Sequence, residues 1–408
     1  MPGYSSGEGM GNIIDYIREY GHELFEERPF SAEDSLVLAQ FAYLKLDGAV
    51  PSVREGGRTI NLSEVKRRKP DREIFADTRY EEENRALLDA LTESRRFGSL
   101  GLNYHENHID REREYQFCAV TCFLDNGLVY LAFRGTDESI VGWKEDFNMA
   151  FRPPVPGQLL SVSYVNRVAE LLGMQGGGSA DDAKAGRRLM LGGHSKGGNF
   201  AVYAAMNCDR NVQDEILSVY SHDGPGFRPE IFESDAFARI RSRIVKIIPH
   251  SSVVGMLFDN HEPYQVVESS TFGILQHDPF TWELRGGHFI KVKDLYKGRK
   301  ISNEVLNRWI MSLDEEQLEN FVESLFEAVN ASRAETLPEF TEQWFQNSLR
   351  IMQAFRGMDK ETKRQMRKTM AALLRAVSEI LSERRKGKNE EHEQFRRGYG
   401  NGTDNTFD

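Results

Sequence analysis

Apolar positions near the start of the chain follow the spacing of helices. Residues 10–46 are predicted to be helical, and Ser31 is a suitable N-cap because its hydroxyl can accept a hydrogen bond from the first helical turn. The apolar residues that follow lie close to one helix face: Leu36, Ala39, Phe41 and Leu44. Residues 52–114 are dense in charge, so we expect exposed helices and loops there.

The middle of the chain alternates short apolar runs with turns and helical segments. Residues 115–124 and 128–134 are apolar and β-branched, and Asp125-Asn126-Gly127 between them is a hairpin turn signal. Further patterns predict strands at 187–192, 216–220, 244–248 and 264–267, and helices at 165–172 and 200–206. Strands that alternate with helices favour an α/β domain with a mostly parallel central sheet flanked by helices.

The C-terminal part returns to a helical pattern. Residues 303–385 are predicted to be helical, with a capping box at Ser312–Glu315, and the tail from Lys386 is polar and predicted to be disordered. We therefore expect an N-terminal helical segment (1–50), an α/β core (51–300), a C-terminal helical region (301–385) and a disordered tail (386–408).

One part of the C-terminal region is strongly basic. Residues 359–388 hold ten Lys or Arg against four Asp or Glu, interleaved with apolar residues. A basic amphipathic helix of this kind can make peripheral contact with an anionic membrane. The same composition is typical of a solvated helix packed on the body of the protein, which is the interpretation we favour.

Charge and cysteine content narrow the class of protein. The 408 residues carry 52 Lys or Arg and 63 Asp or Glu, a net charge of −11, which argues against nucleic acid as the main partner. Cys118, Cys122 and Cys208 show neither zinc-ligand spacing nor a disulfide framework, so we expect buried thiols in a reducing compartment. The start of the chain lacks the pattern of a signal peptide, and no run of 18 apolar residues occurs, which together predict a cytoplasmic location.

The segment RRLMLGGHSKGGNFAVYAAM carries the clearest chemistry. It holds a G-x-S-x-G motif, Gly193 to Gly197, between a predicted strand and a predicted helix. The turn from strand to helix is tight enough that side chains at the two glycines would collide with neighbouring backbone. Such an elbow exposes the Ser195 hydroxyl and places the backbone N–H of Lys196 beside it, so Ser195 is the candidate nucleophile.

Three further segments, together with this motif, resemble the class 3 (fungal-type) lipases of the α/β-hydrolase superfamily. They are LAFRGTDESIVGWKEDFNMAF, VYSHDGPGF and RIVKIIPHSSVVGMLF, and the likeness covers residues 115–290. The N-terminal region and the amino-acid sequences of these motifs resemble an uncharacterised bacterial family of lipase-like α/β hydrolases more closely still. The resemblance implies an α/β-hydrolase fold, with Thr136 as a second oxyanion donor and Arg134 and Asp146 as a structural ion pair.

The sequence departs from the lipase pattern in two places. Lys196 replaces an aliphatic residue after the nucleophile, and we expect its ammonium to affect access to the site. The lipases carry their catalytic Asp in a D-x-V-P segment, but the matching stretch, Ser252 to Gly255, holds no carboxylate. Asp223, in the turn after the strand at 216–220, is the best replacement, either as the triad acid or merely as a cap of that turn. Asp259 is the alternative acid.

The base must follow the nucleophile, because the chain order in this fold is Ser, acid, His. His277 comes after the predicted strand at 264–267 and matches the place of the final histidine in the lipases; the alternative is a surface loop histidine. His288 is the fallback, and Asp278 is expected to cap a loop or helix. His250 and His261 are less well placed in the sequence to act as the base. His222 is expected to lie behind the catalytic groups, and His194 is expected to pack beneath the nucleophile.

These residues predict a serine hydrolase that cleaves carboxylic esters, with small-molecule or lipid esters as substrates and no cofactor or metal. Thioesterases and peptidases use the same machinery. A catalytically inactive hydrolase fold that serves as a binding scaffold is the alternative from another class, motivated by the missing lipase-type Asp.

Overall fold

The computed structural model describes most of the chain up to residue 295 and a few positions beyond it. The described residues are 10–76, 78, 80–110, 112–113, 115–136, 145, 149, 153–174, 188–258, 263–271, 273–295, 304–305, 307–310, 312–313, 316–317 and 364. Glu315 of the predicted capping box, the tail from Lys386 and almost all of the basic segment lie outside them.

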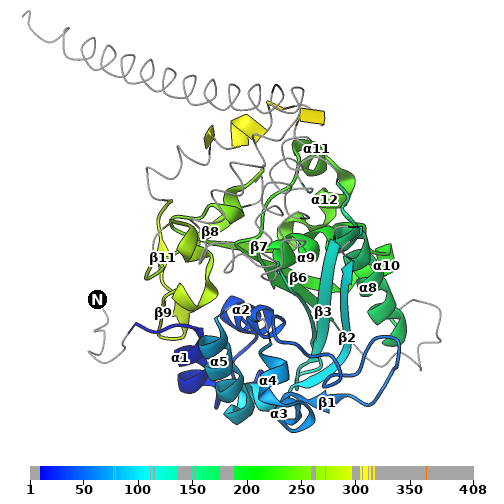
Figure 1. Ribbon diagram of the computed structural model, residues 1–408, viewed down its shortest axis with the longest axis vertical. Helices are drawn as coiled ribbons and strands as arrows, with labels where there is room; N and C mark the ends of the chain where they lie inside the picture. The colour runs from blue at the N-terminus through cyan, green and yellow to red at the C-terminus, as the bar shows by residue number, and fades with distance from the viewer. Residues whose placement is uncertain are drawn as a thin grey trace, which may run out of the picture.

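A central sheet organises the described residues and holds nine strands (Figure 1). In spatial order they are β1 (Ile60–Asn61), β2 (Gly101–Asp110), β3 (Tyr115–Phe123), β4 (Val129–Phe133), β5 (Leu189–His194), β6 (Ile216–His222), β7 (Ile244–Pro249), β8 (Tyr264–Val267) and β11 (Lys291–Val292). Strands β4 to β8 run parallel, β1 to β4 pair antiparallel, and β11 closes the far edge antiparallel to β8. This is an α/β-hydrolase fold, as the sequence predicts.

Side chains of the sheet alternate between two buried layers, as the pleat of a strand requires. On β5, Leu189 and Leu191 pack with the helices α8 (Pro156–Leu171) and α9 (Lys196–Asn207). Met190 points to the opposite layer, which contains α1 (Ile13–Tyr20), α2 (Ala32–Phe41) and α5 (Glu81–Glu93). The sheet is therefore covered by helices on both faces, which keeps its strands out of water.

Short elements complete the described part. The helices are α3 (Val65–Arg68), α4 (Asp71–Ile74), α6 (Arg95–Gly98), α10 (Arg210–Asp214), α11 (Pro229–Phe232) and α12 (Asp235–Ile240). The 3-10 turns are η1 (Leu62–Glu64), η2 (Arg241–Arg243), η3 (Val254–Met256), η4 (Gly273–His277) and η5 (Pro279–Thr281), and β9 (Leu284–Arg285) pairs with β10 (His288–Phe289). None of the helices in these ranges is long and apolar enough to cross a membrane.

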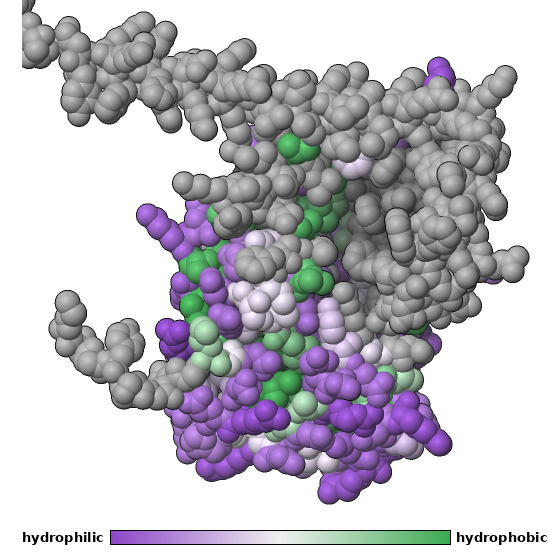
Figure 2. All heavy atoms as spheres, turned by 60° about the vertical axis from the view of Figure 1, so that its left-hand side comes forward, coloured by the Kyte–Doolittle hydropathy of each residue, from purple (hydrophilic) through white to green (hydrophobic). Residues whose placement is uncertain are grey.

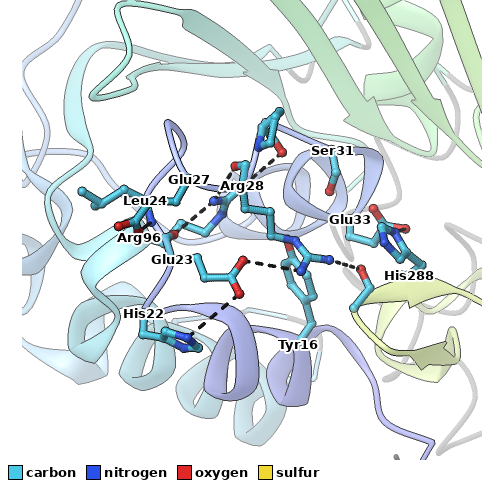
Figure 3. A network of polar contacts seen from close by, with 12 residues as sticks. Tyr16, His22, Glu23, Leu24, Glu27, Arg28, Ser31, Glu33, Arg96 and His288 are labelled. Carbon is cyan, nitrogen blue, oxygen red and sulfur yellow. Dashed lines mark hydrogen bonds and ion pairs between the residues drawn. The ribbon is translucent and has the colours of Figure 1, made fainter. Parts of the chain in front are cut away.

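A buried ion pair and hydrogen bonds from arginine side chains anchor the N-terminal helices to the core. Ser31 caps α2 as predicted, and Asp34 of α2 forms a fully buried ion pair with Arg96, with a shortest N···O distance of 2.7 Å. Arg96 also donates to the carbonyl of Glu23 at 3.1 Å, and Arg28 donates to the carbonyl of Gly287 at 3.1 Å (Figure 3). These contacts hold residues 13–41 in one buried cluster with the sheet.

The prediction for residues 52–114 is partly wrong. Strand β2 lies within this range, although GLNYHENHID lacks the alternation of a half-buried strand. Strand β2 pairs with β3 along most of its length. This pairing stabilises the strand, although its polar side chains do not predict one. The charge of the segment does face water: the end of the molecule formed by α3, α4 and β1 is covered mainly by hydrophilic side chains (bottom in Figures 1 and 2).

Candidate active site

Ser195 lies in the turn that joins β5 to α9. Strand β5 ends at His194 and α9 begins at Lys196, so a single residue makes the change of direction. Ser195 has a φ of 58°, a backbone conformation that residues with a side chain rarely adopt. Its N–H donates to the carbonyl of His222 on β6 at 2.9 Å, which holds the strained turn against the neighbouring strand.

The two glycines of the motif are required by close backbone contacts. A Cβ at Gly197 would lie 2.1 Å from the carbonyl oxygen of Phe133, and one at Gly193 would lie 2.4 Å from the carbonyl carbon of Gly197. Both separations are far below van der Waals contact, so neither position accepts a side chain. The predicted elbow is therefore present, with glycines for the predicted reason.

His277 and Asp223 are in direct contact. Nδ1 of His277, at the end of η4, lies 2.6 Å from Oδ2 of Asp223, which follows β6. The Asp223 side chain is 1% exposed and that of His277 is 12% exposed. Two residues 54 positions apart are thus brought together at the carboxyl end of the parallel strands, where active sites of open α/β sheets assemble.

The other carboxylate oxygen of Asp223 is held by the stretch where the lipases would carry their acid. Oδ1 accepts from the Ser252 hydroxyl at 2.5 Å and from the N–H of Gly255 at 3.1 Å. A Cβ at Gly255 would lie 2.3 Å from Oδ1, so glycine there leaves room for the carboxylate. Although Asp223 follows β6, its carboxylate therefore lies against the segment that carries the acid in the lipases. Its φ is 49°, a conformation that Asp tolerates better than most residues. Asp259, the alternative acid, lies outside the described residues.

The loop that presents His277 is anchored by its neighbours. Gln276 is fully buried, and its Oε1 accepts from the N–H of Ser251 at 2.6 Å. The indole N–H of Trp282, also fully buried, donates to the Gln276 carbonyl at 2.8 Å. Asp278 caps η5 through the N–H of Phe280, which confirms the structural role predicted for it.

The other described histidines have different surroundings. His288 is exposed on β10, 3.8 Å from a carboxylate oxygen of Glu33 (Figure 3). His250 contacts the side-chain amide of Gln276. His222 is buried against Ser35 of α2, and burial lowers its pKa to about 3, so it is neutral at physiological pH. His261 lies outside the described residues.

The ammonium of Lys196 does not affect access to the site, contrary to the prediction. Lys196 is 1% exposed, and its Nζ lies 2.9 Å from Oε2 of the buried Glu145. The same carboxylate accepts from the N–H groups of Gln116 and Gly157, so the charge pair lies inside the core beneath the elbow. Only the backbone of Lys196 is left to act at the site.

The predicted Arg134–Asp146 pair falls partly outside the described residues, because Asp146 is not among them. The guanidinium of Arg134 is buried and donates to Oδ1 of Asn107 at 3.1 Å. This bond ties the end of β4, which leads to Thr136, to the neighbouring hairpin.

Thr136 lies against the elbow. A Cβ at the preceding residue, Gly135, would lie 2.5 Å from the carbonyl oxygen of His194 and 3.0 Å from Cβ of Ser195. The backbone after β4 is therefore packed on the turn that holds Ser195. Lys196 is the first residue of α9, so its N–H belongs to the electropositive end of a 12-residue helix.

These residues line one small pocket of about 30 Å³ in the described part of the chain. Its walls are Gln40, Tyr43, Tyr80, Thr136, His194, Ser195, His277, Asp278 and Pro279. The pocket thus gathers the candidate nucleophile, base and oxyanion donor from separate elements, and residues 40–80 supply a wall that the sequence analysis did not assign to the site.

Comparisons with known proteins give one family match and several structural likenesses at low identity. The family model described as Mbeg1-like matches residues 91–327, a span that includes Ser195, Asp223 and His277. No curated protein sequence matches significantly. The chain is similar to the Rhizomucor miehei lipase propeptide complex at 20% identity, covering 45% of this chain and 59% of that one, with a TM-score of 0.31. It is also similar to lipase II from Rhizopus niveus at 15% identity, covering 65% and 87%, with a TM-score of 0.37.

Proposed function

This chain belongs to the Mbeg1-like family, and from the geometry of its pocket we propose that it is a serine hydrolase that cleaves carboxylic esters through an acyl-enzyme on Ser195. The observation that carries the proposal is the 2.6 Å contact between the buried Asp223 and His277, which lines the same pocket as Ser195 in its strained elbow. A hydroxyl is a weak nucleophile unless such a base is beside it. That the family is bacterial stays a prediction.

Asp223 sets the direction of proton transfer. A carboxylate only accepts hydrogen bonds, so Nδ1 of His277 carries a proton and Nε2 keeps its lone pair. Nε2 removes the Ser195 proton as the hydroxyl oxygen attacks the ester carbonyl. The imidazolium that forms is stabilised by the Asp223 charge, and it then returns the proton to the leaving alcohol.

The oxyanion is stabilised by backbone donors. In our proposal the N–H groups of Thr136 and Lys196 point at the carbonyl oxygen as it gains charge, and each is worth about 3 kcal/mol of barrier. The N-terminal end of α9 adds its dipole at the same point. Water activated by His277 then attacks the acyl-enzyme, releases the carboxylic acid and restores Ser195.

The contacts of Asp223 favour an enzyme over a binding scaffold. The scaffold hypothesis rested on the absence of a carboxylate between Ser252 and Gly255. Asp223 supplies a carboxylate, and the two ends of that stretch hold it in place through hydrogen bonds to Oδ1. A fold that only binds ligands has no need of this arrangement beside a strained serine.

A series of p-nitrophenyl esters from acetate to long-chain acyl groups tests the proposal. We expect the full-length chain to hydrolyse at least one member with saturation kinetics, and the preferred chain length to define the acyl site. Matched thioesters and anilides measured in parallel separate ester hydrolysis from the other acyl-transfer activities of this machinery. Folded protein that turns over none of the esters would contradict the proposal.

A further inference from the structure

His194, directly before the nucleophile, contacts His277 through its imidazole ring, whereas Asp223 contacts Nδ1 of the His277 side chain. Its Nε2 lies 2.7 Å from the backbone carbonyl oxygen of His277, and the two imidazole rings are 4.5 Å apart between centroids. The Nδ1 atom of His194 lies 3.1 Å from the hydroxyl of Tyr43. The side chain of His194 therefore connects Tyr43 to the backbone of the proposed base.

The chemistry of the groups fixes where the protons lie. A backbone carbonyl only accepts, so Nε2 of His194 carries a proton and donates it to His277. In a neutral imidazole the other nitrogen is then an acceptor, so the Tyr43 hydroxyl donates to Nδ1. The two hydrogen bonds therefore suit the same tautomer, and the Tyr43 hydroxyl supports the form of His194 that donates to His277.

Restraint at both ends matters for a general base. Asp223 holds Nδ1 of the His277 ring, and His194 holds the carbonyl of the same residue. A base that misses its proton by about 1 Å loses on the order of 100-fold in rate.

Tyr43 is itself well anchored, although it lies outside residues 91–327 matched by the family model. It follows the end of α2, which is held on the sheet by the hydrogen bond of 2.8 Å between Ser35 and Tyr130. A Cβ at Gly135 would lie 2.2 Å from the Tyr43 hydroxyl. The phenol is therefore packed directly against the backbone that leads to Thr136.

We infer that Tyr43, acting through His194, is a positioning residue for His277, and that the N-terminal segment is part of the active site. The inference rests on the proposed function. It assigns to Tyr43 a role that is exerted through His194, a residue 151 positions further along the sequence.

The Tyr43→Phe variant tests the inference, because it removes the hydroxyl and keeps the ring. We expect labelling of Ser195 by a fluorophosphonate to slow about tenfold, and kcat for an ester substrate to fall by a similar factor while KM changes less than twofold. Nitrogen-15 NMR of labelled histidine provides a readout that needs no turnover. We expect one Nε2–H tautomer for His194 in the wild type and a mixture in the variant.

Tyr164→Phe is the matched control. Its hydroxyl is buried between Thr121 and the carbonyl of Tyr104, away from the pocket, so it measures the general effect of losing a buried tyrosine hydrogen bond. We expect wild-type labelling from this control. Equal labelling rates and an unchanged His194 tautomer in Tyr43→Phe would overturn the role of Tyr43 alone. A wild type that is not labelled at all would overturn the proposed function instead.

Discussion

Replacing Ser195 by alanine is expected to lower kcat for ester hydrolysis by about 10⁴- to 10⁶-fold, because no acyl-enzyme can form without the hydroxyl. Alanine and serine both carry a Cβ that is strained at a φ of 58°, so the thermal melting temperature should change little. Initial rates with the best p-nitrophenyl ester, corrected for the uncatalysed reaction, measure the effect.

Ser161→Ala is the matched control for that variant. Ser161 is also a buried serine, and its hydroxyl donates to the Gln158 carbonyl on α8, in the core behind the sheet. We expect it to lose some stability and to keep its activity. Full turnover by Ser195→Ala would show that another group is the nucleophile.

The Asp223→Asn variant is expected to lower kcat by about 10⁴-fold, with KM nearly unchanged. An amide removes the negative charge that stabilises the His277 imidazolium. It also lets the side chain donate to His277, which favours the tautomer whose Nε2 carries a proton and is unable to act as base. Steady-state kinetics of the variant give both constants.

Asp259→Asn decides between the two acids that the sequence offers. We expect this variant to keep the kcat of the wild type, because Asp223 already contacts His277 at 2.6 Å. The reverse result, an active Asp223→Asn and an inactive Asp259→Asn, would assign the acid to Asp259 and leave the contacts of Asp223 as structural.

Local signals in the sequence predict the elements around the site well. The hairpin at Asp125-Asn126-Gly127 joins β3 to β4, with Gly127 at a φ of 80° as its turn type requires. The alternation of apolar strands and helices likewise predicts β5, α9 and β6. Strand β2 is not predicted, because its residues are polar and the strand forms through pairing with β3. This pairing is a tertiary effect that the local sequence does not show.

The proposed nucleophile, base and acid are also accessible from sequence, because the chain order of the fold limits the choices. The residues that position these three groups are not accessible from the sequence. Tyr43 reaches His194 only through the packing of α2 on the sheet, and nothing local marks it. The direction of the Lys196 side chain depends on the position of Glu145, 51 residues earlier. A pattern along the chain shows which residues are neighbours, whereas these contacts depend on how the layers pack.

The central claim is that Ser195 is an activated nucleophile, and the intact mass after incubation with a fluorophosphonate tests it most directly. We predict a single adduct on the wild type, none on Ser195→Ala, and little or none on His277→Ala within the same time. An adduct that persists on Ser195→Ala, or a folded wild type that acquires none, would contradict the account.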